Sequence, residues 1–159
     1  IPALIKQAQQ GDTDSFIQLY IAVYRPVYKI ARMAMKNEDA AVEAVRLAVL
    51  DSYASLSSAK ITTASQFIEW FVKILCTKIR HLNKTSDIIK NEDGEDIPIR
   101  NALNQLPDIE RLVFSVCSVC GCSAEKAAKL CGYTEETVGV CLTNAEVTLK
   151  AQLLSEMNN

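Results

Sequence analysis

The sequence predicts an all-α fold, and three observations lead to that prediction. Apolar residues recur at spacings of three and four over most of the chain, which is the spacing of one helix face. Residues that commonly cap helices stand directly before several of these segments. The 159 residues include only 5 Gly and 4 Pro and are 49% hydrophobic, so helix breakers are few and one medium core or two small helical cores can form.

The first half of the chain predicts four helices, over residues 3–9, 13–35, 38–56 and 64–82. Gly11 and Asp12 separate the first two helices. Asn37 is expected to cap the third helix, and Thr63 with Gln66 to form a capping box at the start of the fourth.

Each of the three longer helices has an apolar stripe that we expect to face a core. In 13–35 the stripe is Phe16, Leu19, Tyr20, Val23, Val27, Ile30 and Met33 or Ala34. In 38–56 it is Val42, Val45, Val49, Leu50 and Tyr53. In 64–82 it is Phe67, Trp70, Phe71, Ile74 and Ile79.

The second half has the layout of a helix-turn-helix. Pro107 and Asp108 are expected to open one helix and Ser123 to cap a second. A tight turn at Gly132 leads to Thr134, which is expected to cap a third helix that reaches about Met157.

Charge divides the chain into three segments, which we expect to be a first helical domain over 1–84, a linker over 85–100 and a second domain over 101–159. The first segment holds 11 Lys/Arg against 7 Asp/Glu, the linker 2 against 5, and the last segment 4 against 7. The apolar runs are too short to span a bilayer and the N-terminus has no signal pattern, so we expect a cytoplasmic protein without membrane contact.

The last predicted helix has little of the charge that a DNA-reading helix carries. Residues 134–148 contain no Lys or Arg, whereas Glu135, Glu136 and Glu146 are acidic. Contacts of Lys and Arg with phosphate supply much of the affinity for DNA, so these carboxylates oppose binding. The residues of this helix that remain able to contact bases are Thr137, Thr143 and Asn144, because Asn pairs with adenine and Thr contacts the thymine methyl group.

The order and spacing of short motifs resemble the extracytoplasmic-function group of bacterial sigma factors over nearly the whole chain. In the first half the matching residues are Leu4-Ile5, Gly11-Asp12, Phe16, Leu19-Tyr20, Val27-Tyr28, Asn37 to Ala40, Leu50, Tyr53, Phe67, Trp70 and Ile74. In the second half they are Leu103, Leu106-Pro107, Arg111 to Phe114, Gly121 to Ser123, Ala127-Ala128, Gly132 to Thr134 and Thr137-Val138.

The resemblance implies a sigma region-2-like bundle and a region-4-like helix-turn-helix that bind core RNA polymerase and direct it to promoter DNA, with an anti-sigma factor as a possible further partner. The residues it implies for polymerase binding are Glu43, Arg46, Leu50 and Tyr53. For the melted DNA strand it implies Lys73, Lys78, Arg80 and Lys84, and for the upstream element Thr134, Thr137, Thr143 and Asn144.

The chain departs from this family where the last helix customarily carries cations, at Gly139, Cys141, Asn144 and Glu146. Two function classes therefore stay open. One is a working promoter-specificity subunit with few upstream contacts, and the other is a degenerate sigma-like interaction protein that does not bind DNA. An apolar patch of Val42, Leu47 and Ala48 that a different partner covers is an alternative to polymerase docking, with Val45 and Val49 as core.

The six cysteines are expected to be packing residues in a reducing compartment, without disulfides. The spacing of Cys117, Cys120 and Cys122 leaves a metal or redox sensor as an alternative. The sequence has neither a glycine-rich phosphate loop nor a nucleophile spaced to meet the single histidine, His81, so we expect no enzyme, no metal and no cofactor.

Overall fold

The computed structural model describes residues 1–85 and 98–158, and within these ranges it is all helical, as the sequence predicts. The helices are α1 (Pro2–Gln9), α2 (Thr13–Ala34), α3 (Glu38–Ser55), the short 3-10 helix η1 (Leu56–Ser58), α4 (Ala64–Thr85), α5 (Pro98–Asn104), α6 (Asp108–Cys120), α7 (Ala124–Cys131) and α8 (Glu135–Met157). No helix in this part of the chain is long and apolar enough to cross a membrane.

The predicted caps are present. The backbone N–H of Ala40 donates to Asn37 Oδ1 at 2.8 Å, and that of Gln66 donates to Thr63 Oγ1 at 3.2 Å. Ser123 accepts from the backbone N–H of Lys126 at 3.2 Å. Because a cap needs only neighbouring residues, the helix starts could be predicted closely from local sequence.

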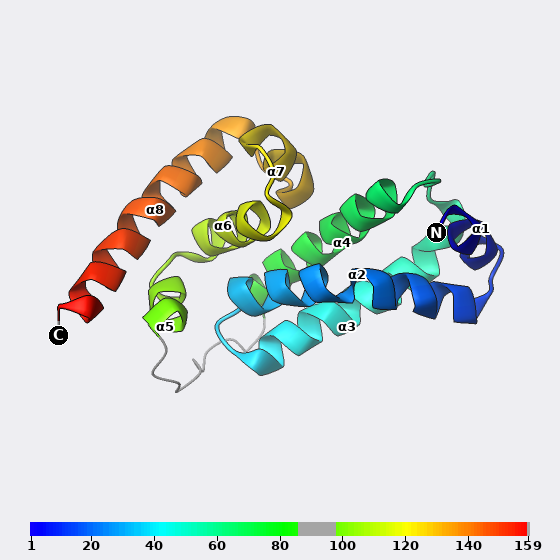
Figure 1. The fold of residues 1–159 in the computed structure, drawn as a ribbon, viewed down its shortest axis with the longest axis horizontal. Helices are drawn as coiled ribbons and strands as arrows, with labels where there is room; N and C mark the ends of the chain where they lie inside the picture. The colour runs from blue at the N-terminus through cyan, green and yellow to red at the C-terminus, as the bar shows by residue number, and fades with distance from the viewer. Residues whose placement is uncertain (86–97, 159) are drawn as a thin grey trace.

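Helices α1 to α4 form one end of an elongated molecule, and α5 to α8 form the other (Figure 1). The stripe of α2 is inward as predicted: Phe16, Leu19, Val23, Val27 and Ile30 are all buried. Phe67, Phe71 and Ile79 of α4 are likewise buried, whereas Trp70 and Ile74 are half-buried at the edge of this core.

The predicted inward face of α3 is wrong in three of its five residues. Val42, Leu50 and Tyr53 are exposed, Val49 is half-buried, and Val45 alone is buried. The residues that face the core are instead Ala40, Ala41, Ala44, Val45, Ala48 and Ser52. Helix α3 packs against both α2 and α4. Small side chains permit that close approach, and the larger apolar ones point outward.

Helix α5 lies partly inside the predicted linker. Residue 85 belongs to α4 and residues 98–100 belong to α5, while the remainder of the predicted linker, 86–97, lies outside the described residues. Ala102, Leu103 and Leu106 pack with Ala145 and Leu149 of α8 in a small second core. The helix therefore fixes the start of the second half against its last helix.

The two halves of the chain pack closely together, because α6 contacts α2 and α7 contacts α4 (Figure 1). A single main core runs from Ile5 of α1 to Cys141 of α8. Two arginines of the second half also reach the C-terminal end of α2. Arg100 donates to the carbonyl oxygens of Arg32 and Met33, and Arg111 Nε donates to that of Ala34 at 2.7 Å. These cations satisfy carbonyls that a helix end leaves without partners and lie at the negative end of its dipole.

Candidate functional site

An apolar groove lies between α2 and α3 on the outer surface of the first half. It encloses about 310 Å³ and is lined by Tyr20, Tyr24, Tyr28, Val42, Val45, Arg46, Val49 and Leu50. The tyrosines are four residues apart on α2, so their rings lie one above the other. The ring centroids of Tyr20 and Tyr24 are 5.8 Å apart, and those of Tyr24 and Tyr28 are 5.6 Å apart. The α2 wall of the groove is therefore aromatic, and its α3 wall is mostly aliphatic.

The polar rim of the groove is an ion pair on α3. Arg46 donates from Nε and Nη2 to the two carboxylate oxygens of Glu43, at 2.9 and 2.7 Å. The hydrogen bond from Arg46 lowers the pKa of the Glu43 carboxyl, which stays ionised at neutral pH. A two-point pair of this kind holds the guanidinium in one orientation beside the apolar walls.

Three of the four residues predicted to bind polymerase belong to this groove or its rim. Arg46 and Leu50 line it, and Glu43 pairs with Arg46. Tyr53 lies elsewhere: its hydroxyl is 2.9 Å from that of Thr13, and its ring packs edge-on against Phe16. The alternative apolar patch is not formed as a unit, because Val42 is exposed, Leu47 is half-buried and Ala48 is fully buried.

Sequence reasoning missed the tyrosine wall of the groove. The apolar periodicity places Tyr20 in the core stripe and gives Tyr24 and Tyr28 no role in a site. The signal was present, because tyrosines at 20, 24 and 28 follow the four-residue spacing of one helix face. Their position beside α3 does not follow from the sequence, because the pattern of large apolar residues predicts the wrong buried face for α3.

The four basic residues predicted to contact a melted strand do not share one surface. Lys78 Nζ forms an ion pair with Asp51 of α3 at 2.8 Å. Lys73, Arg80 and Lys84 follow another side of α4, because spacings of seven and four residues return to nearly the same helix face. These three residues border the second half: Lys73 lies beside α7, and Arg80 and Lys84 lie beside α6 and Tyr133.

Arg80 is held against the turn between α7 and α8. Its guanidinium carbon is 5.5 Å from the centroid of the Tyr133 ring, a cation–π contact. Gly132 makes room for it, since a Cβ at that position would lie 3.1 Å from Arg80 Nη2. In this arrangement Arg80 serves the contact between the two halves.

The predicted upstream-element residues lie on α8 or at its start. Thr134 Oγ1 accepts from the backbone N–H of Thr137 at 3.1 Å and donates to the Thr137 hydroxyl at 2.8 Å. The Thr143 hydroxyl donates to the carbonyl oxygen of Gly139 at 3.1 Å. Asn144 is exposed. The hydroxyls of Thr134 and Thr143 thus bond within the helix and its cap, and Asn144 lies on the exposed face of the helix.

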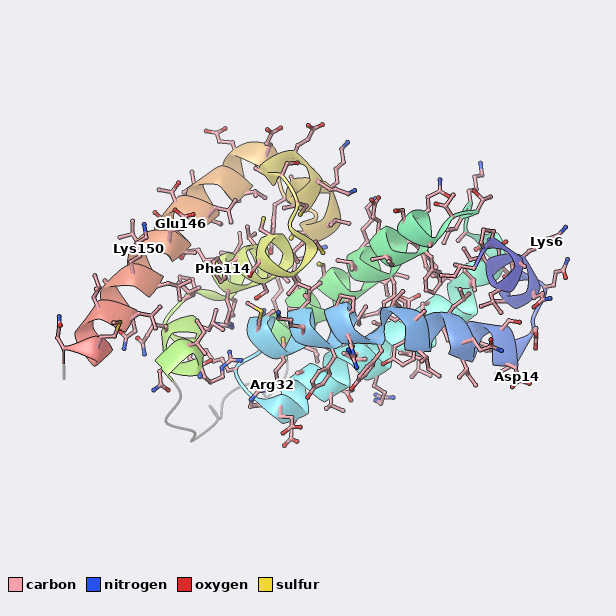
Figure 2. The ribbon with its side chains drawn as sticks, in the orientation of Figure 1. Lys6, Asp14, Arg32, Phe114, Glu146 and Lys150 are labelled. Carbon is pink, nitrogen blue, oxygen red and sulfur yellow. The ribbon has the colours of Figure 1, made fainter. Side chains whose placement is uncertain are left out.

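The exposed face of α8 is acidic and apolar over most of its length. It carries Glu135, Glu136, Val140, Glu146 and Val147 before the first cation of the helix, Lys150. Figure 2 marks Glu146 and Lys150 on this helix, at the side of the molecule away from α2 and α3.

The other cations of the second half are engaged elsewhere. Arg100 and Arg111 are buried at the end of α2. Lys126 pairs with Glu69 of α4, and Lys129 with Glu125 at 3.7 Å. Within the described residues, the second half therefore presents no continuous basic surface to a nucleic acid.

No metal site forms from the cysteine motif. In residues 1–85 and 98–158, no three side chains of His, Cys, Asp or Glu come together closely enough to hold an ion. The six cysteines are free thiols.

Neither a family model nor a curated protein matches the sequence. Two solved structures have the same fold. The structure of CnrH in complex with the cytosolic domain of CnrY superposes with a TM-score of 0.74 and 21% identity over 97% of this chain and 97% of that chain. The sigma factor RpoE in complex with the anti-sigma factor NepR, from Bartonella quintana, superposes with a TM-score of 0.71 and 21% identity over 89% of this chain and 98% of that chain.

At this level of identity the likeness establishes the fold. The chain has the all-α fold of these two structures, and the all-α class is the one that the sequence predicts.

Proposed function

We propose that this protein is a sigma-like factor of transcription initiation that docks on core RNA polymerase through the groove between α2 and α3. The observation that carries the proposal is the groove itself. Leu50 is 56% exposed and Val42 is 51% exposed, beside three tyrosines and an ordered Arg46–Glu43 pair. An apolar surface with a polar rim is the usual composition of a protein interface.

The position of the groove also supports polymerase as the occupant. The family resemblance assigns polymerase docking to the helix that contains Glu43, Arg46 and Leu50, and these residues form one wall and the rim of the groove. The likeness of fold to the sigma factor RpoE supports the same assignment.

Promoter contact in this proposal depends mainly on the first half. Lys73, Arg80 and Lys84 form a basic stripe on α4 that borders α6 and α7. Contact of Arg80 with a melted strand therefore requires the second half to move away from α4. Polymerase binding supplies the free energy for that opening in our proposal.

An anti-sigma factor is the second partner that we propose. RpoE is bound to an anti-sigma factor in its solved structure, and CnrH is bound to the cytosolic domain of CnrY. A protein that covers the groove of this chain would exclude polymerase from the same apolar surface.

A second candidate function is a sigma-like interaction module that does not bind DNA. The specific observation in its favour is the exposed face of α8, where carboxylates and valines stand in place of cations. Such a face repels phosphate and suits a protein partner. The two candidates share polymerase or partner binding and differ in DNA binding.

The groove is tested by substituting Leu50→Glu and measuring affinity for purified core RNA polymerase. Leu154→Glu is the matched control, because Leu154 is 59% exposed on α8, far from the groove. We expect Leu50→Glu to weaken binding at least tenfold and Leu154→Glu to leave it within about twofold, the loss being that of a central apolar contact. Equal affinities of the two variants would contradict docking through the groove.

A further inference from the structure

Helix α8 is apolar on two opposite faces. One face packs against α5, α6 and α7 through four buried residues, Val138, Cys141, Ala145 and Leu149. The opposite face lies in solvent, although it carries three large apolar residues, Val140, Val147 and Leu154, which are 56%, 65% and 59% exposed. A helix that is apolar on both faces is ordinarily covered on both, so the outer face of α8 indicates an interface.

The outer face of α8 is also regular. Its residues alternate at spacings of four and three, which is the pattern of the line along which two packed helices meet. We call this line the outer seam, and its members, all of them exposed, are Glu136, Val140, Thr143, Val147, Lys150 and Leu154. The surface of α8 is therefore suited to a second helix that lies along it rather than to a short loop.

We propose that the outer seam binds the outer seam of a second copy of this chain, with the two α8 helices antiparallel. The inference does not rest on the proposed function, because no residue of the outer seam lines the groove between α2 and α3. Helix α8 lies at the end of the molecule away from that groove (Figure 1). Two copies paired through α8 would leave both grooves open.

The charges of the outer seam favour a second copy and fix the direction of pairing. Glu136 lies near the start of α8, Lys150 lies near its end, and Thr143 is midway between them. A two-fold axis at Thr143 places Glu136 of each copy opposite Lys150 of the other, so that two equivalent ion pairs form. A parallel pair would instead bring together two Glu136 carboxylates and two Lys150 ammonium groups.

Both charged residues are available for this contact. Their side chains are exposed, and within residues 1–85 and 98–158 neither Glu136 nor Lys150 forms an ion pair. Lys126 and Lys129 of the neighbouring helix α7 are by contrast paired with carboxylates of this chain. Pairing between copies therefore costs α8 no ion pair that it already has.

The same two-fold axis brings the apolar residues of the outer seam together. Val140 of one copy lies opposite Val147 of the other, and symmetry repeats this contact. Leu154 lies near the turn at Gly132 of the second copy. Because one helix pair is a small interface, we expect weak association, with a dissociation constant on the order of 10 µM.

Pairing through the outer seam would conceal part of α8 from DNA. Thr143 belongs to the outer seam and Asn144 adjoins it, and both are among the residues predicted to contact the upstream element. A dimer of this kind cannot place the same face of α8 in a major groove. Self-association and DNA contact by this helix are therefore mutually exclusive.

The first test is sedimentation equilibrium of the full chain with a reducing agent, because the six cysteines are free thiols. The measured mass should rise from 17.5 kDa toward twice that value between about 1 and 300 µM protein. Val147→Glu should weaken association at least tenfold. The matched control is Ile21→Glu on α2, because Ile21 is 67% exposed and Val147 is 65% exposed, and it should change the dissociation constant by less than about twofold.

Two results of this test would overturn the proposal. One is a wild-type chain that stays monomeric over the whole concentration range. The other is association that Ile21→Glu weakens and Val147→Glu does not, which would place the contact on the first half. Circular dichroism of each variant confirms that folded proteins are compared.

Reversal of single charges tests the antiparallel direction. Glu136→Lys alone and Lys150→Glu alone should each weaken self-association about tenfold, because each creates two like-charge contacts per dimer. An equimolar mixture of these two variants should associate about as tightly as the wild type. Glu135→Lys, at an exposed residue outside the outer seam, makes the same change in net charge as Glu136→Lys and should have less than about a twofold effect. Single reversals that associate like the wild type would overturn the antiparallel pairing.

Discussion

Arg111 of α6 donates a hydrogen bond from Nε to the carbonyl oxygen of Ala34, the last residue of α2, at 2.7 Å. The same guanidinium donates to the Leu106 carbonyl at 2.7 Å and to Asp108 Oδ1 at 2.5 Å, although the residue is only 1% exposed. One buried cation thus joins the end of α2, the start of α6 and the segment before it. Its burial is tolerated because the donors are satisfied.

Replacement of Arg111 tests how much its buried hydrogen bonds contribute to stability. Arg111→Met keeps much of the apolar volume but leaves two buried carbonyl oxygens without donors. We expect the free energy of unfolding to fall by about 3 kcal/mol, measured by urea titration. Lys129→Met, at an exposed ion pair on α7, should change it by less than about 0.5 kcal/mol. If the two variants lost similar amounts of unfolding free energy, the buried hydrogen bonds of Arg111 would not be important for stability.

Substitution by alanine at two glycines should change the stability of the protein in opposite directions. Gly132 has φ +81° and its Cβ would meet Arg80 at 3.1 Å, so Gly132→Ala should destabilise the protein by about 1–2 kcal/mol. Gly139 lies in helix α8 with open space around its Cβ, so Gly139→Ala should stabilise it by about 0.5–1 kcal/mol. Thermal unfolding should give a lower melting temperature for Gly132→Ala and a higher one for Gly139→Ala than for the wild type. A shift in the same direction for both variants would contradict these roles of the two glycines.

The Asp51–Lys78 ion pair predicts a dependence of stability on pH. Hydrogen bonds from Lys78 and then Ser55 lower the pKa of the Asp51 carboxyl. A carboxyl with a lowered pKa in the folded state stabilises the fold at neutral pH, and this contribution is lost as the pH falls through the lowered value. Because both side chains are partly exposed, Asp51→Asn should cost only about 0.5 kcal/mol at pH 7.

The measurement is urea unfolding of the wild type and Asp51→Asn at several pH values. The difference between them should shrink steadily on acidification. A difference that is constant with pH would mean that the carboxylate charge does not contribute.

Adding cations to α8 should create the DNA affinity that its surface lacks. Val140 and Asn144 are exposed on this helix, and arginine at both positions would place two positive charges near phosphate. The slope of log affinity against log salt for promoter-length DNA should steepen by up to about 2, at ~0.9 per phosphate contact. The double variant Val140→Leu, Asn144→Gln is the uncharged control and should leave the slope unchanged. An unaltered slope in the arginine variant would indicate that α8 does not face DNA.

Local signals explain which parts of the fold could be predicted from sequence. The caps at Asn37, Thr63, Ser123 and Thr134 act within three residues, so the helix starts they predict agree with the structure. The inward face of α3 was wrong because periodicity gives weight to large apolar residues, whereas two neighbouring helices select the alanines. Helix α5 was missed because it is short and adjoins an acidic segment.

Only part of the candidate site could be predicted from the sequence, because the rest depends on how the helices pack. Arg46 and Leu50 were named from a resemblance and do line the groove, but the tyrosines opposite them depend on how α2 and α3 pack. The burial of Arg111 could not be predicted, because a charged residue in a sequence is ordinarily expected at the surface. Its three acceptors come from segments as distant as residue 34, and no local pattern reveals them.

The central claim is that the groove between α2 and α3 makes this chain a polymerase-binding sigma-like factor. The most direct measurement is the affinity of the wild-type chain for purified bacterial core RNA polymerase, followed by promoter binding of that complex over a salt series. We expect a stable complex whose promoter affinity exceeds that of core polymerase alone. Absence of any complex with core polymerase would contradict the claim and leave a sigma-like fold that acts on another protein.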